Sequence, residues 1–196
     1  MYVFKYRIIG FSLSFVLLLV LALSGSGIAF ADSTTGTATV NAGTLTETNA
    51  TTPGVSATLD GTDQTASYTL VITATDATGS GSGWNLTITS TTFITDEATP
   101  HTLSTSASLL TGVTAACVAS TTCTNPTNAI TYPVAVPAAA TAPPAVKFFN
   151  ASANTGMGKF SVTPMISISL PAGMYPGVYS SIVTLQRFAE TLTYER

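Results

Sequence analysis

The stretch that decides the fold is Asp76–Thr92, which reads DATGSGSGWNLTITSTT. Glycines alternating with serines lead into Trp84, and from there apolar and polar residues alternate strictly. The apolar set is Trp84, Leu86 and Ile88, and the polar set is Asn85, Thr87 and Thr89. A period of two predicts a β-strand with one buried face and one solvent-exposed face.

The residues before the glycine-rich loop predict a second strand. Residues 67–75 alternate in the same way, and only Val71 places an apolar side chain among the polar ones. Two alternating segments around the loop Gly79–Gly83 indicate a β-hairpin, with Trp84 as the largest side chain of the core.

The remainder of the chain after the N-terminal segment also has strand character and no helical periodicity. We expect further strands within residues 37–48, 55–59, 93–94, 103–110, 130–136, 146–150, 160–170 and 178–188, and a long loop over 111–129. Gly- and Pro-containing turns separate them. The sequence therefore predicts an all-β fold, an antiparallel β-sandwich (Greek-key or related) of about eight to ten strands, after an N-terminal hydrophobic signal helix.

The N-terminal segment has the composition of an export signal. Lys5 and Arg7 precede the uncharged run Ile8–Leu23, and Ala29-Phe30-Ala31 is a small-residue cleavage site. We predict a signal peptide over residues 1–31, cleaved after Ala31, and a single domain over 32–196. The alternative is an uncleaved membrane anchor, although the run is shorter than the ~20 residues that usually span a bilayer. Both alternatives place the remainder outside the cytoplasm.

The charge of the mature chain restricts its partners. Four basic and nine acidic residues follow Ala31, which gives a net charge of −5. This balance is opposite to that of a nucleic-acid-binding domain. It also disfavours simple ionic attraction to an anionic wall polymer or lipid surface. Binding to a wall would therefore depend on aromatic and hydrogen-bonding groups.

The two cysteines, Cys117 and Cys123, are predicted to form a disulfide that closes a short loop, because an exported chain meets an oxidising environment. A metal site is disfavoured because residues 102–129 contain no His, Asp or Glu. The spacing also lacks the CxxC pattern of redox centres.

Three segments carry a resemblance to a known family: Gly83-Trp84-Asn85-Leu86-Thr87, the preceding turn Asp76–Gly81, and the closing corner Pro171–Tyr179. In these segments the chain resembles the WxL surface-domain family of bacteria. The resemblance implies an exported protein that is held non-covalently at the cell wall. The family usually carries a second Trp-x-Leu in its last strand, where this chain has Tyr179–Leu185 and no tryptophan.

The candidate binding residues are Trp84, Tyr175 and Tyr179, each with two open roles. Trp84 is either a core aromatic, since Leu86 and Ile88 share its face, or a residue that stacks on the wall polymer. The tyrosines either form a ligand platform or donate their hydroxyls to nearby backbone, as a tyrosine at such a corner commonly does.

No catalytic, cofactor or metal residues are predicted. His101 with Asp96 and Glu97 is an acid–histidine cluster without an assignable nucleophile, and a solvated loop explains it. The Asp60–Asp63 and Asp76 turns carry oxygen ligands but lack the spacing of a calcium loop.

The sequence thus predicts a secreted, non-catalytic cell-surface protein whose partner is a wall polymer (peptidoglycan) or another surface protein. The alternative is a subunit of an extracellular fibre or coat that assembles by pairing of exposed strand edges.

Overall fold

The computed structural model describes residues 38–49 and 53–190. The chain divides into two compact units, Met1–Val40 and Asn41–Arg196, and only residues 38–40 of the first unit are described; they have no regular secondary structure. The predicted signal peptide and its cleavage site at Ala31 lie outside the described residues. Among the described residues, no helix is long and apolar enough to cross a membrane.

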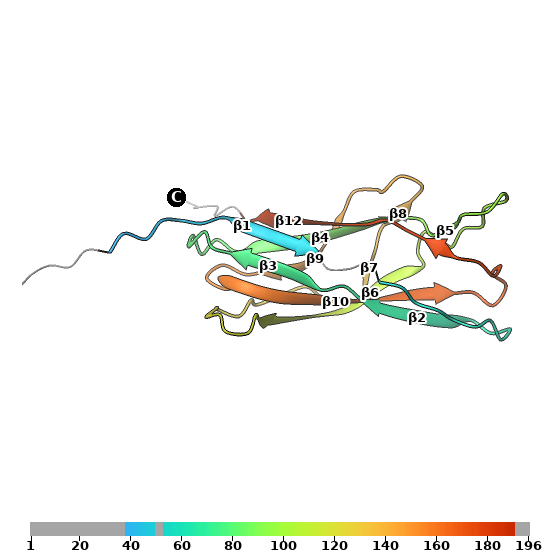
Figure 1. The fold of residues 1–196 in the computed structure, drawn as a ribbon, viewed down its shortest axis with the longest axis horizontal. Coiled ribbons are helices and arrows are strands. Elements are labelled where there is room, and N and C mark those ends of the chain that lie inside the picture. Colours follow the sequence, from blue (N-terminus) through green and yellow to red (C-terminus); the bar gives the residue numbers. More distant parts are fainter. Residues whose placement is uncertain (1–37, 50–52, 191–196) are drawn as a thin grey trace, which may run out of the picture. The chain divides into compact units, whose positions relative to one another are not determined.

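The second unit is built from β-strands, as predicted, and its described residues contain no helix (Figure 1). One sheet has the strand order β1-β3-β10-β6-β7, with β2 also paired to β10. Its strands are β1 (Leu45–Asn49), β2 (Gln64–Thr69), β3 (Ile72–Asp76), β6 (Ser108–Cys117), β7 (Val134–Ala135) and β10 (Gly158–Leu170).

The second sheet is centred on the tryptophan strand. It has the order β12-β4-β8, with β9 also paired to β4. Its strands are β4 (Trp84–Thr91), β8 (Ala138–Ala139), β9 (Val146–Ala151) and β12 (Val183–Ala189), and a separate two-stranded sheet pairs β5 (Ile94–Thr95) with β11 (Tyr179–Ser180). All strand pairs are antiparallel except β4–β8. The described residues thus hold twelve strands, more than expected, because four of them are only two residues long.

The predicted hairpin around the glycine-rich loop is wrong. The strand before the loop, β3, pairs with β1 and β10, whereas β4 pairs with β12, β8 and β9. The loop therefore connects the two sheets. Alternation could not reveal this, because both strands direct their apolar faces into the same core, and a period of two does not say which strands share hydrogen bonds.

The loop is held in place by its own backbone conformation and by side-chain hydrogen bonds. Gly83 has a φ of 82°, and a Cβ there would lie only 2.3 Å from the carbonyl oxygen of Ala151. A larger residue would thus collide with β9. Asp76 accepts hydrogen bonds from the amide and the hydroxyl of Thr78, at 3.0 and 2.6 Å.

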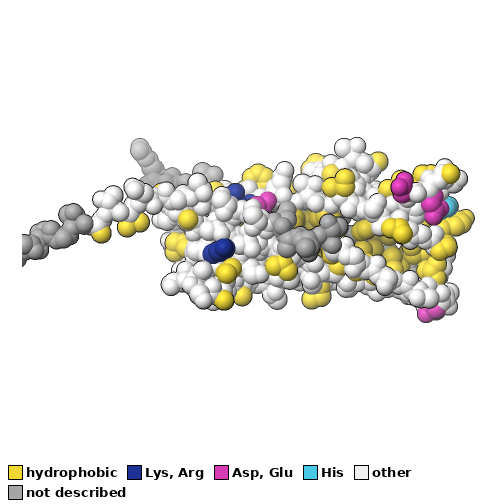
Figure 2. All heavy atoms as spheres, viewed as in Figure 1, with side chains coloured by type: hydrophobic (Ala, Val, Ile, Leu, Met, Phe, Trp, Pro, Cys, Tyr) yellow, Lys and Arg dark blue, Asp and Glu magenta, His cyan; other side chains and the backbone are white. Residues whose placement is uncertain are grey.

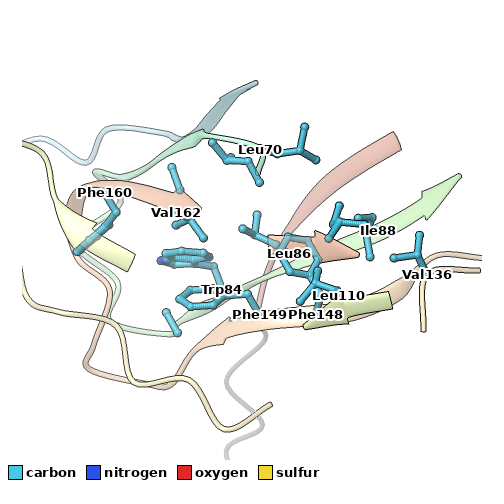
Figure 3. Packing of buried hydrophobic residues seen from close by; sticks show 14 residues of the cluster. Leu70, Trp84, Leu86, Ile88, Leu110, Val136, Phe148, Phe149, Phe160 and Val162 are labelled. Atoms are coloured by element: carbon cyan, nitrogen blue, oxygen red, sulfur yellow. The ribbon is translucent and has the colours of Figure 1, made fainter. Parts of the chain in front are cut away.

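Trp84 lies at the centre of the core (Figure 3). Its side chain has no exposed surface, and its ring centroid lies 5.6 Å from that of Phe149 and 6.3 Å from that of Phe160. The indole Nε1–H donates a 2.8 Å hydrogen bond to the carbonyl oxygen of Gly156. The core thus joins the two sheets through one large ring whose polar atom is paired.

The prediction that one face of β4 is exposed to solvent is also wrong, since Asn85, Thr87 and Thr89 are buried. Thr89 donates a 2.7 Å hydrogen bond to the carbonyl of Pro143, in the Pro/Ala-rich segment that crosses this face. Asn85 donates to Glu190, which also forms a 2.7 Å ion pair with Lys147. Hydroxyl and amide side chains can be buried there because their hydrogen bonds are satisfied.

Three further expectations need correction. Residues 55–59 form no strand and run as an exposed irregular segment. The sixth strand starts at Ser108 and continues to Cys117, into the expected loop, because Phe160–Ile168 of β10 provides a pairing partner along that length. In the 130–136 segment only Val134–Ala135 is a strand. The long alternating strand expected over 160–170 is confirmed as β10.

The edge strands β1 and β12 lie beside each other along one side of the sandwich (Figure 1). The Oε2 atom of Glu47 on β1 and the Nε atom of Arg187 on β12 are buried without a hydrogen-bond partner among the described residues. Burial raises the pKa of Glu47, and the charge of Arg187 opposes this only in part.

Removing the indole should strongly destabilise the fold. We expect Trp84→Ala to lower the free energy of unfolding by ~3–5 kcal/mol, because it leaves a large cavity between the sheets. Trp84→Phe keeps an apolar ring but leaves the Gly156 carbonyl unpaired, which costs ~1–3 kcal/mol. Urea unfolding followed by circular dichroism measures both values. A loss under ~1 kcal/mol for Trp84→Ala would contradict this account of the core.

Replacing Glu47 by Gln should make stability less dependent on pH. The folded-state pKa of Glu47 lies above its ordinary value of 4.5, so its contribution is fully present below pH 4.5 and is lost as the pH rises through the folded pKa. Glu47→Gln should therefore have a higher Tm than the wild type at pH 7, with the difference shrinking below pH 4.5. A lower Tm at neutral pH would mean that attraction to Arg187 outweighs the cost of burial.

Candidate functional site

The described residues form an apolar groove of about 550 Å³ where β2 begins and β10 ends, which we call the end groove. Ala66, Leu103, Ile168 and Leu170 contribute to its floor, together with Phe93 and Met174. One wall is the irregular segment 55–59, and the other is formed by residues 175–179 of the corner 171–179. Figure 2 shows apolar side chains gathered in the hollow at this end of the sandwich.

The corner that forms the second wall is held by one hydrogen bond within it and by another to a distant turn. The hydroxyl of Tyr179 donates to the carbonyl oxygen of Tyr175 at 2.9 Å. The amide of Ala172 donates to Asp63 at 2.8 Å, which ties the corner to the turn before β2. The wall therefore has a defined shape before any ligand arrives, and preorganisation of this kind lowers the cost of binding.

An aromatic pair stands at the rim of the groove. Tyr175 is 60% exposed, and its ring stacks on His101, with ring centroids 3.8 Å apart and planes inclined by 10°. His101 is anchored in turn, because its amide donates to the Thr95 hydroxyl at 2.9 Å. This pair is an accessible flat surface next to an apolar hollow, an arrangement suited to stacking against a ligand.

The structure separates the three candidate binding residues. Tyr175 and Tyr179 line the end groove, the first through its exposed ring and the second with its hydroxyl bound to backbone. Trp84 lies at the start of β4, is fully buried, and contacts the core rather than the groove. In this conformation its indole cannot stack on a wall polymer.

In the acidic turns, the carboxylate oxygens of Asp60 and Asp76 accept hydrogen bonds from residues of the same turn. Asp60 accepts hydrogen bonds from the amide and hydroxyl of Thr62, and bonds from Gln64 and Thr62 lower the pKa of Asp60 to about 2. Asp76 has the same relation to Thr78. Among the described residues, no three His, Cys, Asp or Glu side chains are grouped so that they could hold a metal ion.

The predicted disulfide between Cys117 and Cys123 is present, with the two Cα atoms 6.0 Å apart. Cys117 ends β6 and lies opposite Phe160 of β10, whereas the end groove adjoins Ile168 and Leu170 of the same strand. At ~3.3 Å per residue, this separates the disulfide from the groove by about 30 Å.

A family model described as "WxL domain surface cell wall-binding" matches residues 22–165 of the chain. The chain belongs to the WxL family. No curated protein and no solved structure matches it. The family description places this WxL protein at the cell surface or cell wall.

The end groove of the WxL domain was not predicted from the sequence. Segment 55–59 was interpreted as a strand, and Phe93, Leu103 and Met174 belong to separate parts of the chain that only the fold brings together. One signal was present: the corner 171–179 carries apolar side chains where a turn is usually polar. The corner also lies beyond the residues that the family model matches.

Removing the disulfide should weaken the fold without changing the end groove. We expect the double variant Cys117→Ser/Cys123→Ser to lose ~2 kcal/mol of stability, because the crosslink closes a short loop. Urea unfolding measures this loss. Binding at the end groove should be unchanged under conditions in which the variant is folded, and a loss of binding there would contradict the separation of the two features.

Proposed function

We propose that this WxL protein attaches non-covalently and without catalysis to peptidoglycan, and that the end groove is its contact site. The observation that carries the proposal is the Tyr175–His101 stack, an exposed aromatic surface beside a preformed apolar hollow. The family description supports the class of ligand. The acidic balance of the chain supports a contact made by stacking and hydrogen bonds rather than by ionic attraction to anionic polymers.

The family's signature tryptophan supports this role indirectly. Because Trp84 is buried and bonded to Gly156, it stabilises the sandwich on which the groove is built. The chain's lack of a second tryptophan then removes no contact from the groove, whose exposed aromatic residue is Tyr175.

The alternative of a fibre subunit assembled by edge pairing has weaker support. The edge strand β1 is five residues long and directs Glu47 toward Arg187, and an inward-pointing charge is a common means by which proteins discourage pairing at an edge. Concentration-dependent polymers of the purified protein would favour the fibre over the wall binder.

Sedimentation with purified peptidoglycan tests the proposal. The full chain, purified in mild detergent, should bind peptidoglycan, and Tyr175→Ala should reduce the affinity about tenfold, because an aromatic residue that stacks on a ligand commonly contributes more than ~1 kcal/mol. Phe188→Ala is the matched control, since Phe188 is also an exposed aromatic residue but pairs with Asn85 near Trp84. Its affinity should be unchanged.

Circular dichroism of both variants shows whether each is folded. Failure of the wild-type protein to sediment with peptidoglycan would overturn the proposal. Equal losses for Tyr175→Ala and Phe188→Ala would overturn the assignment to the end groove.

A further inference from the structure

Acidic residues lie next to both walls of the end groove, although none is among the residues that line it. Asp60 follows directly on the wall segment 55–59, and Asp63 lies three residues further along the chain. Asp63 accepts a hydrogen bond from the amide of Ala172, at the start of the corner that forms the opposite wall. Glu97 stands close to Gly177 of the corner, where a Cβ would lie 3.1 Å from its Oε1 atom. Asp96 is its neighbour in the chain. Figure 2 shows acidic side chains next to the apolar hollow.

The lysines and arginine of the described residues lie elsewhere on the sandwich. Lys147 and Arg187 sit opposite Thr87 and Leu86 of β4, and Lys159 stands near the start of β10. Leu170, in the groove, is eleven residues further along β10, which at ~3.3 Å per residue is about 35 Å away. Because charges in physiological salt are screened over ~8 Å, these cations do not neutralise the acidic rim.

The size of the groove and the irregular, exposed segment of its wall indicate what kind of ligand fits. A hollow of about 550 Å³ is in the range that encloses a small molecule or a short peptide. Residues 55–59 are exposed and form no strand, and among the described residues the Thr58 carbonyl accepts a 2.6 Å hydrogen bond from the Gln64 side chain. An exposed segment that belongs to no strand suits a ligand that itself carries peptide groups, because such a ligand can bind as an added strand.

We propose that the end groove binds the amine-bearing stem peptide of the wall polymer, with its apolar methyl groups on the groove floor, its peptide groups on residues 55–59, and its ammonium group at the acidic rim to which Asp63 and Glu97 contribute. This inference rests on the proposed function and specifies the part of peptidoglycan that is recognised. The cationic amine of a stem peptide complements the charge of this end of the domain, whereas an anionic wall polymer is repelled from it.

Acetylation of peptidoglycan with acetic anhydride tests the inference, because it removes the positive charge of free amines and leaves the glycan strands in place. The wild-type protein should bind acetylated peptidoglycan about threefold to fivefold more weakly than the untreated polymer, the effect expected of an exposed ion pair. Glycan strands freed of their stem peptides by an amidase should bind even less.

A double variant assigns the effect to the groove. Asp63→Asn/Glu97→Gln removes two charges, and the substituted side chain at position 63 retains an oxygen that accepts the Ala172 amide. Its affinity for untreated peptidoglycan should fall to that of the wild type for the acetylated polymer, and acetylation should then have no further effect. Glu190→Gln is the control, since Glu190 pairs with Lys147 away from the groove. It should keep the full sensitivity to acetylation.

The outcomes separate this inference from the proposed function. If the wild-type protein bound untreated and acetylated peptidoglycan equally, recognition of the stem amine would be wrong while attachment to the wall would stand. If it bound neither form, the proposed function itself would be wrong. Equal acetylation sensitivity in the double variant and in Glu190→Gln would place the amine site outside the end groove.

Discussion

The hydrogen bond from the Trp84 indole to Gly156 is the contact on which the rest of the structure depends. It joins the start of β4 to the turn before β10, the longest strand, and so holds the two sheets together through one buried ring. Gly156 has a φ of 68°, and a Cβ there would lie 2.9 Å from the indole nitrogen. A residue larger than glycine at position 156 would displace the indole, so the position of the Trp84 ring depends on this turn.

The opposite end of the sandwich is less regular and carries the candidate site. There the second core cluster, of Leu103, Ala107 and Ile168, is small and opens into the groove. A short pair, β5–β11, and the Tyr179 hydroxyl hold the corner, while residues 55–59 contribute no strand. The domain thus combines a closely packed end with a more accessible end that carries the proposed binding site, a common division in β-sandwiches.

Local sequence predicted the strands better than it predicted their partners. Period-two alternation identified β10 and the inward faces of β3 and β4, since the pattern follows directly from the geometry of an extended chain. It failed for the hairpin, because pairing depends on contacts between distant segments. It also failed for Asn85 and Thr89, whose burial depends on Glu190 and Pro143.

By itself, the sequence determined the all-β class, the disulfide between Cys117 and Cys123, the family and the acidic balance, because each depends on composition, spacing or local period. Only the tertiary structure decided that Trp84 is enclosed while Tyr175 is accessible. Both are aromatic residues near glycines, and exposure depends on what the rest of the chain packs against each ring. The groove was likewise decided by the fold, which gathers its apolar residues from separate segments.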